Sequence, residues 1–307
     1  MTIPQKLQAI QRLSGLNQTK LAAKLGVTFV AFNRWMNDKA IPRKKAQERI
    51  DALYREYTGL TVIPEKELQA KKGIVLLKAK GAGNVLHTIL VNPDIRDQFV
   101  LTLTYTSNSI EGSTLTEAET AVVLFQNVAL PDKTLTEQLE AKNHQTALLY
   151  LFDHLHGRKA VDEHLLLKLH GMLMNGIRPD AGSYRHHGVR IIGADLPTAN
   201  CLKVPSLMEE LAQDFMISRG DIIADAADIH ARFEKIHPFS DGNGRIGRLL
   251  LHAMLLEKNL PPAVIRPERK RLYYSFLNIA QKKDDTSILQ DFFCDAILDG
   301  WDILNRK

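Results

Sequence analysis

The segment 237–248 gathers residue types that suit phosphate chemistry. The short turn Gly242–Gly244 carries little side-chain bulk and stands directly before an apolar, strongly helical stretch. A turn of this kind leaves backbone N–H groups free at the positive end of the helix dipole, and the two effects together favour a bound anion. Arg245 and Arg248 are three residues apart, so we expect both guanidinium groups to point toward the same phosphates.

Two further side chains at the start of the segment add acid–base and metal chemistry. Asp241 supplies the hard oxygen ligand that Mg²⁺ prefers, and His237, with an ordinary pKa of about 6.5, is a candidate general base. Pro238 disfavours helical geometry at His237, so we expect extended backbone there and a preceding helix that stops near Ile236. Each residue alone has an ordinary structural explanation, but their gathering in one short segment predicts an active site.

The segment resembles the signature of the Fic family, His-Pro-Phe-x-[Asp/Glu]-Gly-Asn-[Gly/Lys]-Arg-x-x-Arg, and departs from it at no position. The resemblance implies a protein adenylyltransferase, which transfers AMP from ATP to a Ser, Thr or Tyr hydroxyl of a protein. It implies that His237 deprotonates the acceptor and that Asp241 holds Mg²⁺. The residues that it assigns to the nucleotide phosphates are Gly242, Asn243 (with backbone and side chain), Gly244, Arg245 and Arg248. Family members with Lys at the position of Gly244 include Doc-type kinases, so Gly244 favours AMP transfer.

Two flanking segments resemble other parts of the family pattern. Residues 182–193 are similar to its flap hairpin, which is expected to align the target backbone by strand addition; the alternative is an ordinary surface hairpin. The flap residues assigned to target docking are Val189, Arg190, Ile191 and Ile192. Tyr273 and Tyr274 stand where the family places aromatic residues near adenine, although core packing explains them equally well. Gln281 stands where an Asn is common, which leaves base recognition open.

An upstream segment resembles the inhibitory pattern of the family, [Ser/Thr]-x-x-x-Glu-[Gly/Asn]. It runs from Ser107 to Gly112, within an inhibitory helix expected near 100–112. The resemblance implies that Glu111, on a helix ended by Gly112, pairs with Arg248 and keeps it from the γ-phosphate. The alternative is a helix C-terminus with an exposed glutamate.

The first 58 residues resemble the helix-turn-helix domain of Cro/repressor-type regulators. Apolar spacing predicts helices over 4–13 and 18–25, a third from the N-cap Thr28 to Trp35 or Met36, and a fourth from Pro42 to about Tyr57. Ala22 allows close helix crossing, and Gly26 supplies the turn. The alternative is a three-helix module for protein docking.

The charge of this domain favours a nucleic-acid partner. Residues 1–60 contain 11 Lys and Arg against four Asp and Glu, a net charge of +7, whereas the whole chain carries +5. The resemblance implies that the helix 28–37 enters the major groove of DNA. The residues expected to face DNA there are Thr28, Phe29, Val30, Asn33, which could pair with adenine, and Arg34, which could contact guanine or phosphate. Candidate phosphate contacts are Lys20, Lys24, Arg43, Lys44 and Lys45.

The remaining pattern predicts a mainly α fold. We divide the chain into a helix-turn-helix domain (1–58), a linker with a small β-hairpin formed by 74–77 and 85–91 (59–91), and a Fic domain (92–307) with a β-hairpin flap. Two distant cysteines imply no disulfide framework. No apolar stretch follows the first residues, and none is long enough to span a bilayer, so we expect a cytoplasmic protein without membrane association.

The interpretation of function is a regulated AMP transferase with a DNA-binding domain. It uses ATP and Mg²⁺, acts on an unknown protein that includes itself as a candidate, and pairs as a homodimer if it binds two-fold DNA sites. Two alternatives stay open. One is a transcriptional regulator that senses nucleotide without turnover, and the other is a Fic enzyme that removes AMP or transfers another phosphate-containing group.

Overall fold

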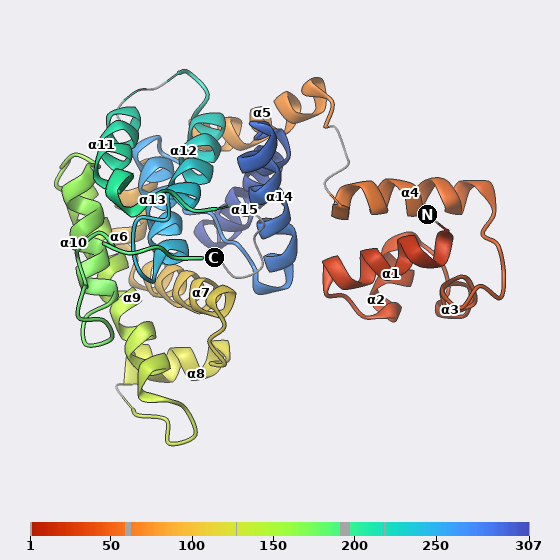
Figure 1. The fold of residues 1–307 in the computed structure, drawn as a ribbon, viewed down its shortest axis with the longest axis horizontal. Helices are drawn as coiled ribbons and strands as arrows, with labels where there is room; N and C mark the ends of the chain where they lie inside the picture. Colours follow the sequence, from red (N-terminus) through yellow and green to blue (C-terminus); the bar gives the residue numbers. More distant parts are fainter. Residues whose placement is uncertain are drawn as a thin grey trace.

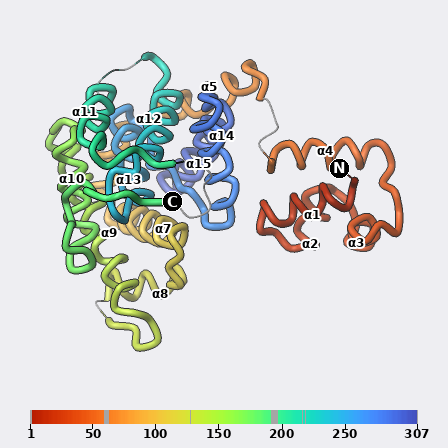
Figure 2. The backbone as a smooth tube through the Cα atoms, viewed as in Figure 1, coloured from red at the N-terminus to blue at the C-terminus, as the bar shows by residue number. Residues whose placement is uncertain are grey.

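The computed structural model describes residues 2–58, 63–126, 128–190, 197–215, 217 and 219–306. These residues form helices joined by turns, with no β-strand among them (Figure 1). The mainly α class predicted from the sequence is therefore confirmed. The chain folds into a small N-terminal group of four helices and a larger helical body (Figure 2).

The N-terminal group follows the predicted helix pattern closely. Its elements are α1 (Ile3–Ser14), α2 (Gln18–Leu25), α3 (Phe29–Met36) and α4 (Lys44–Thr58). The side chains of Asn17 and Thr28 accept backbone N–H groups at the starts of α2 and α3, which is how N-caps stabilise a helix. Gly26, at φ 68°, ends α2 in the left-handed region that favours glycine. The core of the group includes Leu7, Ile10, Leu21, Phe32 and Ile50, all fully buried.

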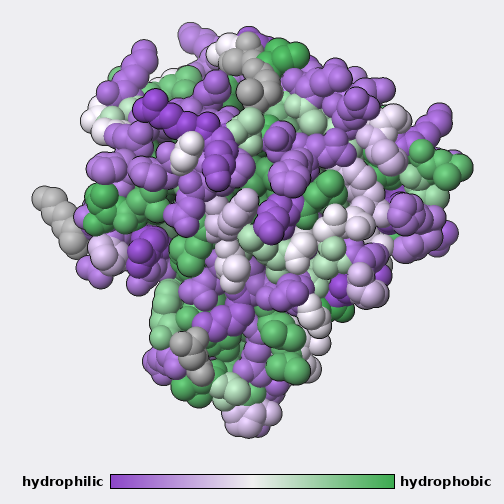
Figure 3. All heavy atoms as spheres, turned by 90° about the vertical axis from the view of Figure 1, so that its left-hand side faces the viewer, coloured by the Kyte–Doolittle hydropathy of each residue, from purple (hydrophilic) through white to green (hydrophobic). Residues whose placement is uncertain are grey.

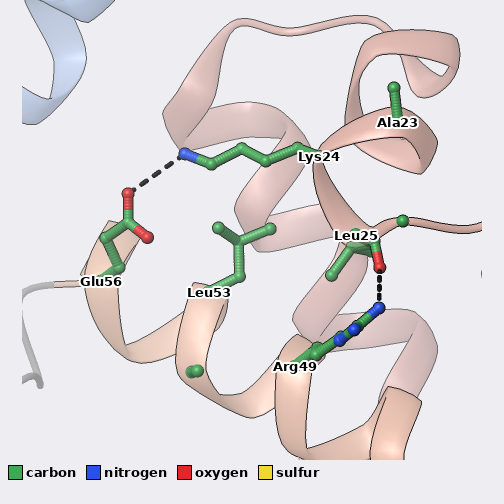
Figure 4. A pocket seen from close by; sticks show the side chains of 8 residues that line it. Ala23, Lys24, Leu25, Arg49, Leu53 and Glu56 are labelled. Carbon is green, nitrogen blue, oxygen red and sulfur yellow. Dashed lines mark hydrogen bonds and ion pairs between the residues drawn. The ribbon is translucent and has the colours of Figure 1, made fainter.

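An open pocket of about 470 Å³ lies between α2 and α4 (Figure 4). Lys24 spans one side of it, with its ammonium group 3.1 Å from Glu56 and 2.7 Å from the hydroxyl of Tyr57. Arg49 donates to the carbonyl of Leu25 at 3.1 Å. Lys24 is thus engaged within the domain, and the prediction that it contacts phosphate loses support.

The prediction for residues 59–91 was wrong in most of its length. Helix α5 (Glu65–Gly81) occupies much of the predicted linker, and α5 and α6 (Val85–Val91) replace the predicted hairpin. A short apolar run does not distinguish a strand from one buried face of a helix. Here Leu68 and Val75 face the core along α5, and the many Lys, Ala and Leu residues favour helix.

The larger body surrounds one central helix, α13 (Asn243–Glu257), whose residues 245–256 are buried on every side. A helix that is apolar nearly all round belongs in the interior of a fold. The helices that pack on it are α7 (Pro93–Glu111), α9 (Leu135–His156), α10 (Glu163–Leu173) and α12 (Ile222–Ile236). The remaining elements are α8 (Glu117–Ala121), η1 (Val122–Gln126), η2 (Cys201–Lys203), α11 (Val204–Phe215), η3 (Pro267–Arg269), α14 (Lys270–Lys283) and α15 (Ser287–Leu304).

The predicted flap has no strand in its described part. Residues 182–190 and 197–200 are turns and irregular backbone, and residues 191–196 lie outside the described residues. Val189 and Arg190 belong to this part, whereas Ile191 and Ile192 lie outside the described residues. The irregular backbone is anchored by Thr198, whose hydroxyl donates to the carbonyl of Val189 at 2.8 Å.

The surface is mixed in character. On the face that Figure 3 shows, hydrophilic residues prevail and hydrophobic ones form separate groups. Exposed apolar side chains at the α8–α9 connection are Phe125, Val128 and Leu135. Among the described residues no single helix is long and apolar enough to cross a membrane, although α5 and α6, which meet at 57°, pass that test as a bent pair.

Candidate active site

The predicted active-site segment connects α12 to α13, and its backbone is held by buried polar side chains. Helix α12 ends at Ile236, as predicted, but His237 adopts φ 53° and ψ 62° instead of extended geometry. This left-handed conformation lets the N–H of His237 donate to the carbonyl of Phe233 at 2.9 Å and close the helix end. Arg185, fully buried, donates to the carbonyl of His237 at 2.7 Å and to that of Ile236 at 3.3 Å.

Asn243 braces the turn from inside. Its amide nitrogen donates to the carbonyl of Phe239, and its amide oxygen accepts the N–H of the same residue, each at 2.8 Å. Only 2% of Asn243 is exposed. These hydrogen bonds give the side chain a role in shaping the turn, and its predicted role in holding phosphate stays a prediction.

His170 on α10 fixes the other side of the turn. Its ring stacks on Phe239 with 3.8 Å between ring centres. Its Nδ1 accepts the N–H of Gly182 at 2.9 Å, so Nε2 carries the proton and donates to the carbonyl of Asp241 at 3.1 Å. Burial lowers the pKa of His170 to about 4, which keeps the ring neutral and this arrangement intact at neutral pH.

His237 is oriented for proton transfer. Its Nδ1 lies 3.2 Å from the carbonyl of Glu234, which accepts a hydrogen bond only if Nδ1 carries the proton. Nε2 then keeps its lone pair. Burial lowers the pKa of His237 against the opposing hydrogen bond to Glu234, and 18% of the side chain stays exposed. The result is a neutral imidazole that solvent can reach, as a general base requires.

Asp241 stands at the mouth of the site, with 55% of its side chain exposed. Its Oδ1 accepts the N–H of Gly242 at 2.6 Å and lies 3.6 Å from Nη2 of Arg245. No cluster of three or more potential metal ligands occurs among the described residues. One exposed carboxylate fits Mg²⁺, because this ion usually takes one or two protein carboxylates together with water and substrate phosphates.

Each of the two buried arginines of α13 is bonded to a different acidic residue. Arg245, 2% exposed, donates to Glu140 on α9 at 2.7 Å. Arg248, also 2% exposed, donates to Oγ and the carbonyl of Ser107 at 2.9 and 3.1 Å and to Glu111 at 2.6 Å. The two guanidinium groups are therefore held by different carboxylates, and the expectation that both bind the same phosphates stays a prediction.

Glu111 is the last residue of α7, and Gly112, at φ 112°, ends the helix as predicted. Its carboxylate lies against the first turn of α13, where a Cβ at Gly244 would clash with Oε1 of Glu111. Burial raises the pKa of Glu111, but attraction by Arg248 and the hydrogen bond between them outweigh it and lower the pKa overall. The anion-binding end of α13 is thus occupied by a carboxylate, and the absent side chain of Gly244 makes room for it.

The two predicted adenine contacts lie in different surroundings. Tyr273 is fully buried, and its hydroxyl lies 2.6 Å from Nε2 of His230, which identifies it as a core residue. Tyr274 is 37% exposed, and its phenol lies near enough to Glu111 for that charge to raise its pKa after the larger effect of burial. Only Tyr274 remains open to a ligand.

Glu234 is a buried acid that the sequence did not single out. Its Oε2 lies 3.8 Å from Nδ1 of His237, and its Oε1 has no hydrogen-bond partner. Burial raises its pKa to about 8, against the attraction of Arg248 and with added repulsion from Glu111. A Cβ at Gly247 would come within 2.5 Å of Oε1, so this glycine provides the space for the carboxyl group.

Sequence reasoning missed four residues that hold the site together: Glu140, His170, Arg185 and Glu234. Each stands alone in a helix or turn, and its partner lies elsewhere in the sequence, except for Glu234, three residues before His237. The one available signal was that charged side chains at otherwise apolar helix positions need a partner when they are buried.

Comparison with known proteins finds relatives for the larger helical body. Residues 160–255 match the sequence model of the Fic/DOC family. A protein adenylyltransferase Fic of Nematostella vectensis is 31% identical over 194 residues, which cover 59% of this chain and 43% of that protein. The chain thus spans less than half the length of this curated relative.

Solved structures share the fold. A Fic family protein from Desulfovibrio desulfuricans G20 is 27% identical, with a TM-score of 0.64, and the match covers 78% of this chain and 74% of that one. A Fic domain-containing signaling protein from Bacteroides thetaiotaomicron, 21% identical, matches 78% of this chain and 95% of its own with a TM-score of 0.63. Residues 160–255 are thus similar to the Fic/DOC family, and the segment 237–248, at the α12–α13 connection, lies within the matched range.

Proposed function

We propose that this protein transfers AMP from ATP to a hydroxyl group of a protein. The observation that carries the proposal is the pairing of a neutral, solvent-reachable His237 with the positive end of α13. The relatives named protein adenylyltransferase Fic support the same reaction. A protein that only senses nucleotide has no use for a general base beside the anion site.

In the proposed reaction, Nε2 of His237 accepts the proton of a Ser, Thr or Tyr hydroxyl. The hydroxyl oxygen forms a bond to the α-phosphorus of ATP, and the bond from that phosphorus to the bridging oxygen of the β-phosphate breaks. Pyrophosphate leaves with the electron pair. The first N–H groups of α13 lack partners within the helix and stabilise the charge that develops on the phosphates. Asp241 would hold Mg²⁺, which neutralises phosphate charge when bound.

We further propose that the resting protein is inhibited by Glu111. Its carboxylate occupies the start of α13 and engages Arg248, the residue expected to bind the γ-phosphate. ATP then lacks that anchor and binds without the in-line geometry that displacement needs. Nucleotide transfer requires the end of α7 to release Arg248.

Doubly labelled ATP tests the reaction. Incubation of the full chain with Mg²⁺ and a cell lysate is expected to attach the α-label, and not the γ-label, to protein. His237→Ala is expected to lower this attachment by about 10²- to 10⁴-fold while ATP affinity, measured by calorimetry, stays nearly unchanged. Attachment of the γ-label would identify a kinase, and attachment of neither label by wild type and Glu111→Gly would favour the sensor. Release of AMP from pre-labelled protein would favour AMP removal.

We also propose that the N-terminal domain binds double-stranded DNA. The observation that favours it is a set of exposed cationic side chains on and around α3 and α4 that form no ion pair within the described ranges. They are Lys20, Arg34, Lys39, Arg43, Lys44 and Lys45. Exposed, unpaired cations on a helix-turn-helix suit the phosphate backbone. Retardation of a random-sequence duplex by the full chain, weakened by added salt, tests the proposal.

A further inference from the structure

The first turn of α3 exposes apolar side chains at the position where a recognition helix contacts the edges of DNA bases. Phe29 is 47% exposed and Val30 is 66% exposed, and both stand directly after the N-cap Thr28. The rest of this short helix is conventional, since Phe32 and Trp35 turn into the core. Two adjacent apolar side chains at the exposed start of a helix leave apolar surface in contact with water, which favours a binding partner.

The polar residue of the same face is already engaged. Asn33 donates its amide N–H to Gln18 at 3.1 Å, and its amide oxygen accepts a hydrogen bond from Asn37 at 3.2 Å. This chain of amides joins the start of α2 to the end of α3. These contacts fix the orientation of the Asn33 amide, so a bidentate bond to adenine competes with them.

The charge around this apolar pair selects its partner. Arg34 follows on the same helix, and Lys20 on α2 and Lys44 and Lys45 on α4 are exposed in the same domain. Residues 1–60 carry a net charge of +7. A protein partner would gain from the apolar contact, but the surrounding cations favour a polyanion, and only DNA offers both phosphates and exposed methyl groups in one groove.

We propose that Phe29 and Val30 read the 5-methyl groups of thymine in the major groove. The inference rests on the proposed DNA binding and adds its specificity: base selection at the start of α3 comes from carbon contact with methyl groups rather than from hydrogen bonds. Thymine is the base that presents a methyl group in the major groove. Sites bound by this protein therefore carry thymine opposite the first turn of α3.

The test removes the methyl group alone. A random duplex library is selected on the full chain, and the enriched duplex is then made with deoxyuridine in place of each thymine in turn. Deoxyuridine at one or two positions is expected to weaken binding about two- to fivefold per methyl, since burial of one such group contributes about that much. Phe29→Ala and Val30→Ala are expected to weaken binding to the thymine duplex and to abolish the preference over deoxyuridine.

A matched control separates this reading from general apolar contact. Ile41, 83% exposed in the turn after α3, is another surface apolar residue of the same domain. Ile41→Ala is expected to keep the full preference for thymine. An enriched duplex that binds equally well with deoxyuridine throughout would overturn the inference while leaving DNA binding in place. Failure to enrich any duplex would overturn DNA binding itself, and loss of self-association in Phe29→Ala without a change on DNA would assign the pair to a protein contact.

Discussion

Two groups of cations in this molecule are held in opposite ways. Arg245 and Arg248 are buried, and each is hydrogen-bonded to a carboxylate. The cations around α3, such as Arg34 and Lys44, are exposed and form no ion pair in the described part of the chain. A buried charge is stable only with a counter-charge or hydrogen-bond partner, whereas an exposed charge is solvated by water when no ligand is bound. The active-site arginines are therefore bound by carboxylates of the chain itself, Glu140 and Glu111, in place of an anionic ligand. The exposed cations of the N-terminal domain need no such partner.

The largest expected effect is on the rate of AMP transfer, after removal of the Glu111 carboxylate. Glu111→Gly frees Arg248 and the start of α13, so transfer of α-labelled AMP is expected to rise about 10- to 100-fold, as the loss of a competing charge-assisted hydrogen bond predicts. The rate of label incorporation measures the effect. Glu117→Gly, at an exposed glutamate on the neighbouring helix α8, serves as the control and is expected to leave the rate unchanged. Equal incorporation by wild type and Glu111→Gly would contradict the inhibitory role.

Glu140, the acidic partner of Arg245, tests whether every carboxylate bound to an arginine of α13 inhibits the reaction. Glu140 bonds to Arg245 with 19% of its side chain exposed. Glu140→Gln leaves buried Arg245 with only the more distant carboxylate of Asp241, at 3.6 Å, which is expected to lower the melting temperature by several degrees. It is not expected to raise AMP transfer, because Glu140 does not lie against the start of α13 as Glu111 does. A rise in transfer comparable with that of Glu111→Gly would show that both acids restrain the site.

The sequence predicted the local part of the active site and little of its support. The end of α12 and the Glu111–Arg248 contact were predicted, the latter across 137 residues because the pattern of a known family connects them. Helix α13 begins at Asn243, inside the predicted turn. The left-handed His237 was not predicted, because Pro238 favours extended backbone and only the closure of α12 explains the exception.

The supporting residues could not be predicted because their partners are distant in sequence. The ring of His170 reaches a carbonyl 71 residues away, and Arg185 reaches one 52 residues away. Nothing in the local sequence distinguishes such residues from exposed ones. The same limit explains α5, where an apolar run at Ile74–Leu77 suggested a strand until tertiary packing selected one helical face. The chemistry of the local segment could be predicted from the sequence, whereas contacts between distant segments could not.

Glu234 extends the comparison to a buried acid without a hydrogen bond on one oxygen. Its pKa of about 8 exceeds the ordinary value of 4.5, so the folded state keeps a proton that the unfolded chain has released. The stability that this proton confers is fully present below about pH 4.5 and is lost as the pH rises through about 8. Glu234→Gln cannot ionise, so its melting temperature is expected to fall less than that of wild type between pH 6 and 9.

The buried histidines provide the internal reference for that measurement. Burial lowers the pKa of His230 and His252 to about 3, so their contribution is present above about pH 6.5 and is lost as the pH falls. Wild type and Glu234→Gln are therefore expected to share the acid side of the profile and to diverge on the alkaline side. Glu210→Gln, at an exposed position of α11, is expected to follow wild type throughout. Parallel curves for Glu234→Gln and wild type from pH 6 to 9 would mean that Glu234 ionises without cost.

The smallest effect on stability is expected for substitution of the exposed cations, because water already solvates them. Lys44 begins α4, is exposed to solvent and forms no ion pair among the described residues. Lys44→Ala is expected to leave the melting temperature unchanged and to weaken binding to all duplexes alike. The slope of log affinity against log salt should decrease by about one, because one phosphate contact fewer releases one counterion fewer. Lys24→Ala is the matched comparison: Lys24 is bonded to Glu56 and Tyr57, so its loss should disturb the fold and leave the salt slope unchanged. Equal reduction of the slope by the two variants would mean that Lys24 and Lys44 contact DNA phosphates equally. The contrast between lysines bonded within the domain and lysines free to bind DNA would then not hold.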